Sequence, residues 1–247
     1  MSKPRRFVLL TDTHGDMQDD ATVEAVLEFN SIFKPQKRVH MGDAFDFRNL
    51  RRGASDEEKA SSLEDDWIKG SDLLLRFFSG GTENHFLFGN HDDRLFQFQR
   101  SATGLLRDYA TDGIKRVNAL LKRRKVASLP YDSALGILPL GKLNVLHGYH
   151  AGVSAPRLHA AAYGNCAFGH VHTFETASIA SLTPAEARSV GCGCIRDMSY
   201  CNAKTGKLRW GQGWGFGLLF DDGTYHLETA RKINGRFIYA TDFKVTT

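Results

Sequence analysis

The stretch Phe7-Val-Leu-Leu-Thr-Asp-Thr-His14 decides the fold. Phe7 to Thr11 is an unbroken apolar run of the kind that forms a buried strand, and Asp12 and His14 follow it directly. In an open α/β sheet the carboxyl ends of the strands meet at one edge, where ligands bind. The stretch therefore predicts a buried first strand that delivers a carboxylate and an imidazole to such an edge.

Four further segments end in the same way, each after a short apolar stretch that we predict to be a strand. They are Gly42-Asp43-Ala44-Phe45-Asp46, Gly89-Asn90-His91-Asp92, His147-Gly148 and Gly169-His170-Val171-His172. Any one of them has an ordinary explanation, since a Gly-Asp is usually a turn and a His-Gly usually ends a strand. Together they place five sets of metal-binding residue types at strand ends, which predicts one shared site.

The segments between these strands have the pattern of amphipathic helices. Apolar residues recur at helical spacing from Asp20 to Phe33, where Pro35 stops them. Ser55 and Glu58 have the spacing of a capping box in front of a long helix that Gly80-Gly81 closes. Residues 94–125 predict one or two helices, 136–146 a hairpin and 156–162 a short helix. Alternating strands and helices indicate an α/β domain.

From Thr176 onward the sequence becomes glycine-rich and aromatic, which is typical of β structure. No linker, internal repeat or low-complexity tract interrupts the chain. We therefore predict a single domain over residues 1–247, with 176–247 as its β-rich C-terminal part.

The composition is that of an ordinary globular protein, with 247 residues, 42% hydrophobic and 24% charged. Lys and Arg number 32 against 28 Asp and Glu, a net charge of +4 that suits a locally acidic partner. No apolar run reaches the roughly 18 to 20 residues that span a bilayer, so we expect no membrane association. The cysteines, four in number, are sparse, which favours free thiols and a cytoplasmic location.

The five segments, in this order, resemble the calcineurin-like metallophosphoesterase superfamily, whose pattern is D-x-H, G-D-x-x-D, G-N-H-D/E, H-G and G-H-x-H. The resemblance implies a four-layer αββα sandwich of two mixed β-sheets flanked by helices, with the C-terminal β-rich part completing the second sheet. The tail from Gly191 to Gly217 also resembles small phosphoesterases encoded by phages and prophages.

By the same resemblance the site binds two divalent metal ions. Asp12, His14 and His172 would hold one ion, Asn90, His147 and His170 the other, and Asp43 would bridge them. Mixed carboxylate, amide and imidazole ligands suit Mn²⁺, which we favour, or Fe, Zn²⁺ or Ni²⁺. Four positive charges less the two carboxylates and a bridging hydroxide leave about +1, which attracts a phosphate group.

The resemblance also assigns the catalytic residues. His91 is expected to donate a proton to the leaving group, and Asp46 to bind its other ring nitrogen. Asp92 is expected to orient a ligand. Arg48, Arg94 and His150 are candidates for substrate binding, although a surface arginine in a solvated ion pair is as common. The remaining histidines, His40, His85, His159 and His226, are expected to be structural.

These features predict a phosphoesterase that uses a metal-bridging hydroxide, with a preference for phosphodiesters of nucleic acid, either DNA or RNA, or of nucleotides. The basic run from Lys122 to Lys125 supports that preference, although such a run is most often a solvated helix end. The alternatives are a phosphomonoesterase acting on a nucleotide, sugar phosphate or phosphoprotein, and a non-catalytic binding scaffold. Phe47 stands where protein Ser/Thr phosphatases have an arginine, which disfavours a phosphoprotein substrate.

Two other patterns resemble ligand-binding motifs but have simpler interpretations. Gly136 to Lys142 has the spacing of a phosphate-binding P-loop, but Leu143 replaces the Ser or Thr that binds magnesium, so a hairpin is the better interpretation. Cys192, Cys194 and Cys201 lack the spacing of common zinc sites, and we expect reduced thiols.

Overall fold

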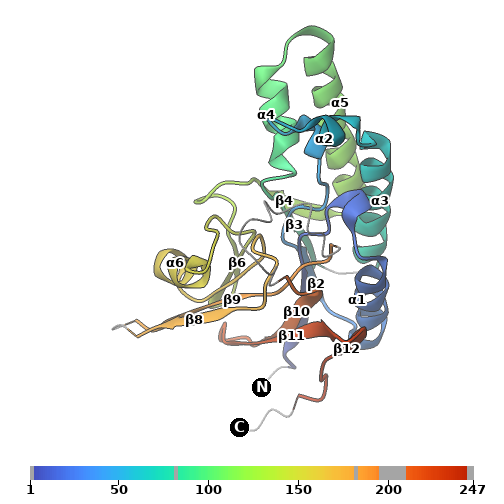
Figure 1. Cartoon of the computed structure of the whole chain (residues 1–247). Coiled ribbons are helices and arrows are strands. Elements are labelled where there is room, and N and C mark those ends of the chain that lie inside the picture. Colours follow the sequence, from blue (N-terminus) through green and yellow to red (C-terminus); the bar gives the residue numbers. More distant parts are fainter. Residues whose placement is uncertain (1–2, 81–82, 181–182, 195–209, 244–247) are drawn as a thin grey trace.

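The computed structural model describes residues 3–80, 83–180, 183–194 and 210–243, which form two β-sheets with helices on their outer faces (Figure 1). The first sheet has the strand order β12-β11-β10-β1-β2-β3-β4 and the second the order β5-β6-β7-β9-β8. The strands of the first sheet are β1 (Arg5–Leu10), β2 (Lys37–His40), β3 (Glu83–Leu87), β4 (Val126–Leu129), β10 (Gly213–Leu219), β11 (Tyr225–Ile233) and β12 (Arg236–Ile238). Those of the second are β5 (Leu138–Leu140), β6 (Leu143–Leu146), β7 (Cys166–Phe168), β8 (Thr176–Ile179) and β9 (Ala185–Ser189).

Both sheets are mixed. In the first, β1 to β4 are parallel and β10 to β12 antiparallel, and in the second a parallel β6-β7-β9 core has antiparallel strands at both edges. The helices are α1 (Asp20–Phe33), α2 (Asp56–Ala60), α3 (Leu63–Phe77), α4 (Asp93–Ser101), α5 (Gly104–Arg123) and α6 (Ala155–Tyr163). Among them α1, α3 and α5 lie along the first sheet, and α6 lies against the second (Figure 1).

Three separate apolar cores match the four layers. Side chains such as Val8 and Phe29 pack between the first sheet and its helices. Alternate residues of the same strand, such as Phe7 and Leu9, face the second sheet. A smaller cluster around Phe168 lies between the second sheet and α6. Because β1 is buried on both faces, it needs the continuous apolar run seen in the sequence. The predicted αββα sandwich is confirmed.

The helices begin and end where local chemistry directs. The Asp19 side chain accepts a hydrogen bond from the Thr22 amide at the start of α1, and Lys34 ends that helix in a left-handed conformation. The capping box of Ser55 and Glu58 is present, but it starts only the short helix α2. Ser62 then caps α3 separately. The single long helix predicted here is therefore wrong, because a serine side chain that binds the backbone favours a new helix start over an interior position.

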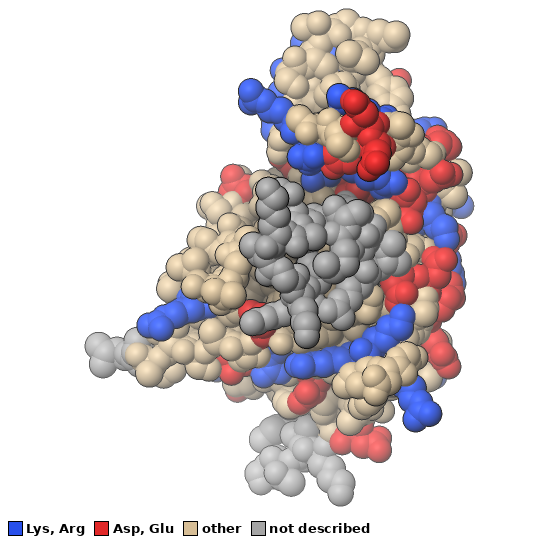
Figure 2. Space-filling view, in the orientation of Figure 1, with Lys and Arg blue, Asp and Glu red and all other residues tan. Residues whose placement is uncertain are grey.

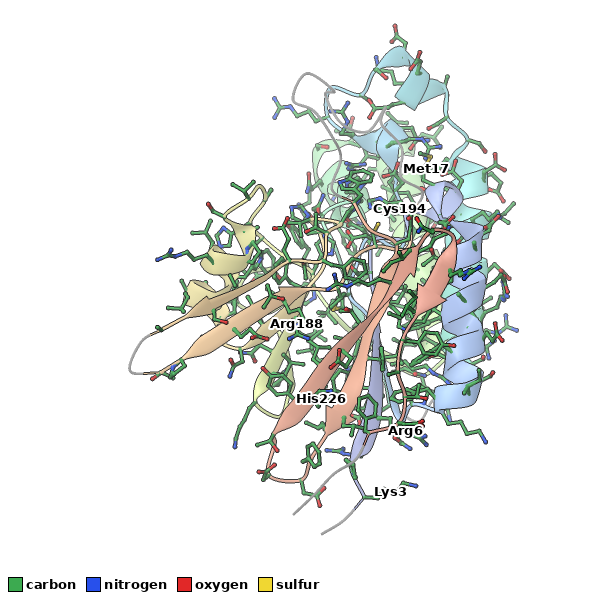
Figure 3. The ribbon with its side chains drawn as sticks, turned by 60° about the horizontal axis from the view of Figure 1, so that its bottom comes forward. Lys3, Arg6, Met17, Arg188, Cys194 and His226 are labelled. Carbon is green, nitrogen blue, oxygen red and sulfur yellow. The ribbon has the colours of Figure 1, made fainter. Side chains whose placement is uncertain are left out.

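The C-terminal β-rich part divides between the two sheets. Strands β8 and β9 complete the second sheet as predicted, but β10 pairs with β1 and extends the first sheet together with β11 and β12. The expectation that the whole part completes the second sheet is thus corrected. The reason is that β1 has only β2 as a parallel neighbour and its other edge needs a partner. Figure 3 shows Cys194 and Met17 near one another at one end of the molecule, with Arg6 and His226 toward the other.

No helix in the described part of the chain is long and apolar enough to cross a membrane.

Candidate metal centre

The segments predicted from the sequence lie together at the carboxyl ends of the central strands. Strands β1, β2 and β3 run parallel in adjacent positions, so the loops after Leu10, His40 and Leu87 emerge side by side. The loops after β6 and β7 reach the same place, since the Gly169 amide donates to the His147 carbonyl and the His170 amide to Asp12 Oδ2. Two sheets therefore contribute to one site.

Many of the predicted ligands have strained backbones. A positive φ angle is found at Asp12, His14, Asp43, His170 and His172, with values from 52° to 66°. Non-glycine residues seldom adopt this left-handed conformation, and it is concentrated where side chains must point at a functional site. The loops that carry these residues are closely packed against one another. A side chain at Gly169, for example, would place its Cβ 2.1 Å from Thr11 Oγ1.

One cluster of donor atoms forms around Asp43, which is almost completely buried. His147 Nε2 lies 3.3 Å from Asp43 Oδ2 and 3.0 Å from Asn90 Oδ1. His170 joins this cluster, with the donor atoms of Asp43, His147 and His170 all within 4.8 Å of one another.

A second cluster forms around Asp12. His172 Nε2 lies 3.2 Å from both Asp12 Oδ1 and His14 Nε2, and His14 Nε2 lies 3.9 Å from Asp12 Oδ1. His14 Nε2 is also 3.9 Å from Asp43 Oδ2. Asp43 thus faces both clusters, as a bridging ligand would.

The donor chemistry of these clusters fits metal ions. His147 Nδ1 is bound to the Met41 carbonyl at 2.9 Å and must carry the ring proton, so a neutral His147 presents only an acceptor at Nε2. That acceptor faces the oxygens of Asn90 and Asp43, and acceptors so close together need a cation between them. His14 is oriented in the same way by Asp46, whose Oδ1 is 3.1 Å from its Nδ1. Such outer hydrogen bonds are typical of metal-binding histidines.

The charges of the clusters support this interpretation. Burial disfavours the His147 cation, but the neighbouring Asp43 carboxylate outweighs burial and raises the pKa of His147 to about 9. Asp12 does the same for His172, whose pKa also rises to about 9. Without metal, the protonated His147 and His172 therefore balance the charges of the two carboxylates, and metal binding would release these protons from the histidines.

His91 lies at the edge of this site, with Nε2 4.0 Å from Asp43 Oδ2. Its Nδ1 is 2.5 Å from Asp46 Oδ1, as the sequence predicted. Burial lowers the pKa of His91, and Asp43 and Asp46 oppose that effect. Burial also disfavours the Asp46 carboxylate, but His14 and His91 together hold its pKa far below the ordinary value. Asp46 is therefore an ionised anchor for two imidazoles.

The three predicted substrate residues have different surroundings. Arg94 Nη2 lies 3.1 Å from His91 Nε2, and its Nη1 donates to the Asp46 carbonyl. Arg48 binds both oxygens of Asp16 and also reaches Asp46. The His150 ring packs 5.0 Å from that of His159. Arg94 is thus placed in the site, whereas Arg48 is held in an ion pair and His150 lies against a structural histidine.

Two buried carboxylates organise the site from behind. Asp92 accepts hydrogen bonds from the amides of Asp43, Phe45 and Gly89, and burial raises its pKa to about 8. Asp66, at the start of α3, accepts from the amides of Asp46 and Phe47. Asp92 was expected to orient a ligand, and the structure shows it bound to the backbone amide of the proposed ligand Asp43. Asp66 was missed, because a carboxylate in the first turn of a helix is ordinarily explained by the helix dipole.

Cys194 is the other residue that the sequence reasoning missed. Its Sγ lies 3.6 Å from His172 Nδ1, and its donor atom groups with those of His14 and His172. Cys166, Cys192 and Cys194 are buried free thiols, as expected. Cys201 lies outside the described residues, as does much of the segment from Gly191 to Gly217. The only signal in the sequence was the pair of glycines that flank Cys192, Gly191 and Gly193, since glycine allows the backbone to lie close to neighbouring groups.

A model of the calcineurin-like phosphoesterase family matches residues 5–161, more than half of the chain. The chain therefore belongs to that family, which is the class that the ordered segments predicted.

Several solved structures are similar to this chain, at low sequence identity. A metallophosphoesterase from Sphaerobacter thermophilus is 12% identical with a TM-score of 0.49, over 93% of this chain and 88% of that one. Vps29 from Entamoeba histolytica is 10% identical with a TM-score of 0.49, over 94% and 96%. The phosphoesterase YfcE from E. coli is 16% identical with a TM-score of 0.43, over 90% and 98%. A comparison with curated proteins gave no match.

Proposed function

We propose that this chain is a binuclear metal-dependent phosphoesterase whose preferred substrates are phosphodiesters of nucleic acid or nucleotides. The observation that carries the proposal is the position of Asp43, which lies 3.3 Å from His147 Nε2 on one side and 3.9 Å from His14 Nε2 on the other. A single carboxylate between two sets of buried donors is what a pair of metal ions requires. Mn²⁺ is the metal we favour.

Two divalent ions held there would supply Lewis acidity at the phosphate oxygens and an activated water. The protein's own contribution is the proton. His91 is the one imidazole of the site that is bound through Nδ1 to a carboxylate and also lies beside Arg94, with its Nε2 toward the centre. In the proposed reaction His91 Nε2, which accepts from Arg94 in this structure, takes up a proton from solvent and gives it to the leaving alkoxide, while Asp46 stabilises the cationic imidazole.

The charge balance favours a diester over a monoester. The loaded site carries about +1, which matches the single negative charge of a phosphodiester. A phosphomonoester brings a second charge and needs another cation. Arg48 is bound on both oxygens of Asp16, and Arg94 is engaged by Asp46 and His91. Among the described residues, the two predicted arginines are therefore committed to internal partners.

The basic run from Lys122 to Lys125 gives this preference no support. It spans the last turn of α5 and the two residues before β4, at the amino end of the parallel strands, whereas the candidate metal-ligand loops lie at their carboxyl end. In the view of Figure 2, basic and acidic side chains are interspersed along the side covered by α1 and α3, and a band of basic side chains crosses the face below the grey atoms. The nucleic-acid preference rests on the charge of the site and the net charge of +4.

The test is a substrate panel combined with metal analysis. We expect protein loaded with Mn²⁺ to hydrolyse bis-p-nitrophenyl phosphate faster than p-nitrophenyl phosphate, and Asp43→Asn to lose both metal and activity. The exposed Arg123→Gln serves as the matched control. A clear preference for the monoester would favour the phosphomonoesterase alternative. Two bound metals without hydrolysis of either compound would favour a binding scaffold.

A further inference from the structure

A pocket lies between α1 and α3, at the end of β2 opposite to the candidate metal centre. It has a volume of about 400 Å³. Its lining residues come from α1, β2, α3 and the segments that follow α3 and α5. Arg38 is in β2 and Asp43 follows that strand, so roughly 15 Å of extended chain separates this pocket from the metal ligands. The end of the molecule at which Arg6 is labelled in Figure 3 is the end from which β1 and β2 start.

The polar side chains of this pocket have unused hydrogen-bonding groups. Asn30 is 6% exposed, and neither its Nδ2 nor its Oδ1 has a partner among the described residues. The Nε atoms of Arg38 and Arg124 are likewise buried and without partners in the described part of the chain. Three donors and one acceptor therefore remain unsatisfied around one cavity. Buried polar groups of natural proteins are rarely left in this state.

The charge of the pocket is positive. No carboxylate is among the lining residues. Arg76 is neutralised at the rim by Glu24, 2.6 Å away. Arg38, 7% exposed, donates through Nη1 to the Ser79 carbonyl after the end of α3. This bond satisfies one donor, but no carboxylate of the described residues forms an ion pair with Arg38. A guanidinium buried beside a second one is costly unless an anion accompanies them.

We propose that this pocket binds the phosphate group of a small phosphorylated ligand. A phosphate oxygen can accept from each of the three unused donors, and a guanidinium fork suits phosphate better than any other basic side chain does. The cavity exceeds the size of a phosphate ion, and Leu27, Leu75 and Phe77 give it apolar walls that fit the organic part of the ligand. This site is independent of the metal centre and of the proposed reaction.

The test uses phenylphosphonate, which carries the anion and an apolar ring and is not hydrolysed at its carbon–phosphorus bond. Calorimetric titration of the metal-loaded protein and of protein treated with a chelator separates the pocket from the metal centre, because only the pocket binds without metal. We expect saturable binding in both preparations. Inorganic phosphate is expected to compete, and benzyl alcohol, which has the ring without the charge, is not.

Two variants test the assignment of residues. Arg124→Gln removes a half-buried guanidinium and is expected to weaken binding to the chelated protein roughly tenfold or more, whereas the neighbouring Arg123→Gln leaves it unchanged. Asn30→Asp places a carboxylate between the arginines; it is expected to abolish binding and raise the melting temperature, since it supplies the missing counterion. Undiminished binding in both Arg124→Gln and Asn30→Asp, or no saturable binding to the chelated wild-type protein, would overturn the proposal.

Discussion

His159 provides a sharp test of how the loop after β6 is held. Its ring is fully buried and uses both nitrogens: Nδ1 donates to the Ala155 carbonyl at 2.8 Å, and Nε2 accepts from the Tyr149 amide at 3.0 Å. The ring also stacks on Phe168 at 4.1 Å. Only the neutral imidazole can make both bonds. Protonation would set Nε2 against the Tyr149 amide, two residues after the proposed ligand His147.

The expected size follows from the pKa. Burial lowers the pKa of His159 from 6.5 to about 4, while the bond to the Ala155 carbonyl opposes the shift. The unfolded chain therefore binds a proton near pH 6.5 that the folded protein resists until about pH 4. This contribution to the free energy of unfolding is fully present above pH 6.5 and is lost as the pH falls toward 4. At 1.36 kcal/mol for each pKa unit the loss is about 3 kcal/mol.

The assay is urea unfolding of chelator-treated protein at several pH values between 4 and 7.5. Other groups also titrate there, so the informative quantity is the difference between wild type and His159→Gln. We expect the variant to be less stable at pH 7.5 and to lose less stability on acidification, so that the two curves approach each other. His226→Gln, at an exposed histidine, controls for removal of an imidazole. Parallel curves for wild type and His159→Gln would refute the reasoning.

Three further predictions concern the candidate metal centre. His91→Ala is expected to retain metal, measured by mass spectrometry, while the turnover of a diester with an ordinary alkoxide leaving group falls roughly 10²-fold or more; full activity would contradict its role as proton donor. Asp92→Asn keeps one acceptor oxygen but turns an amide group toward a backbone N–H, which should cost about 1–3 kcal/mol of unfolding free energy in urea titrations, and an unchanged midpoint would contradict this. Gly89→Ala is expected to abolish metal binding, because the added Cβ would lie 2.1 Å from Asp43 Oδ1, so wild-type metal content in that variant would show that the loop can move.

The sequence was most informative where a local pattern and a long-range constraint agreed. The run before Asp12 predicted a strand buried on both faces, and α1 has the predicted bounds, Asp20 to Phe33. The convergence of the ligand segments followed from the rule that parallel strands end at one edge. In the structure the donor atoms of these residues lie close together. That they bind metal ions is the proposed function.

The sequence was least informative where an outcome depended on neighbours far along the chain. No local sequence pattern indicates that β10 pairs with β1, because paired residues of the two strands are some two hundred positions apart in the sequence. The basic run from Lys122 to Lys125 was taken as support for a phosphodiester substrate, because its charge can be read from the sequence. Its position at the amino end of the strands cannot be read from the sequence. Asp66 and Cys194 reach the site only through packing. Arg48 was a candidate for substrate binding until Asp16 was seen beside it.

The pairing of β1 with β10 also bears on how the chain is made. Phe7↔Gly217 and Leu9↔Gly215 are partners in this ladder, so β1 leaves the ribosome some two hundred residues before the strand that pairs with it. Until then the edge of β1 to which β10 binds is open. An exposed apolar edge strand is a site of aggregation during synthesis. A chain truncated after residue 161, where the family model ends, would keep that edge permanently and is expected to require a chaperone to remain dispersed.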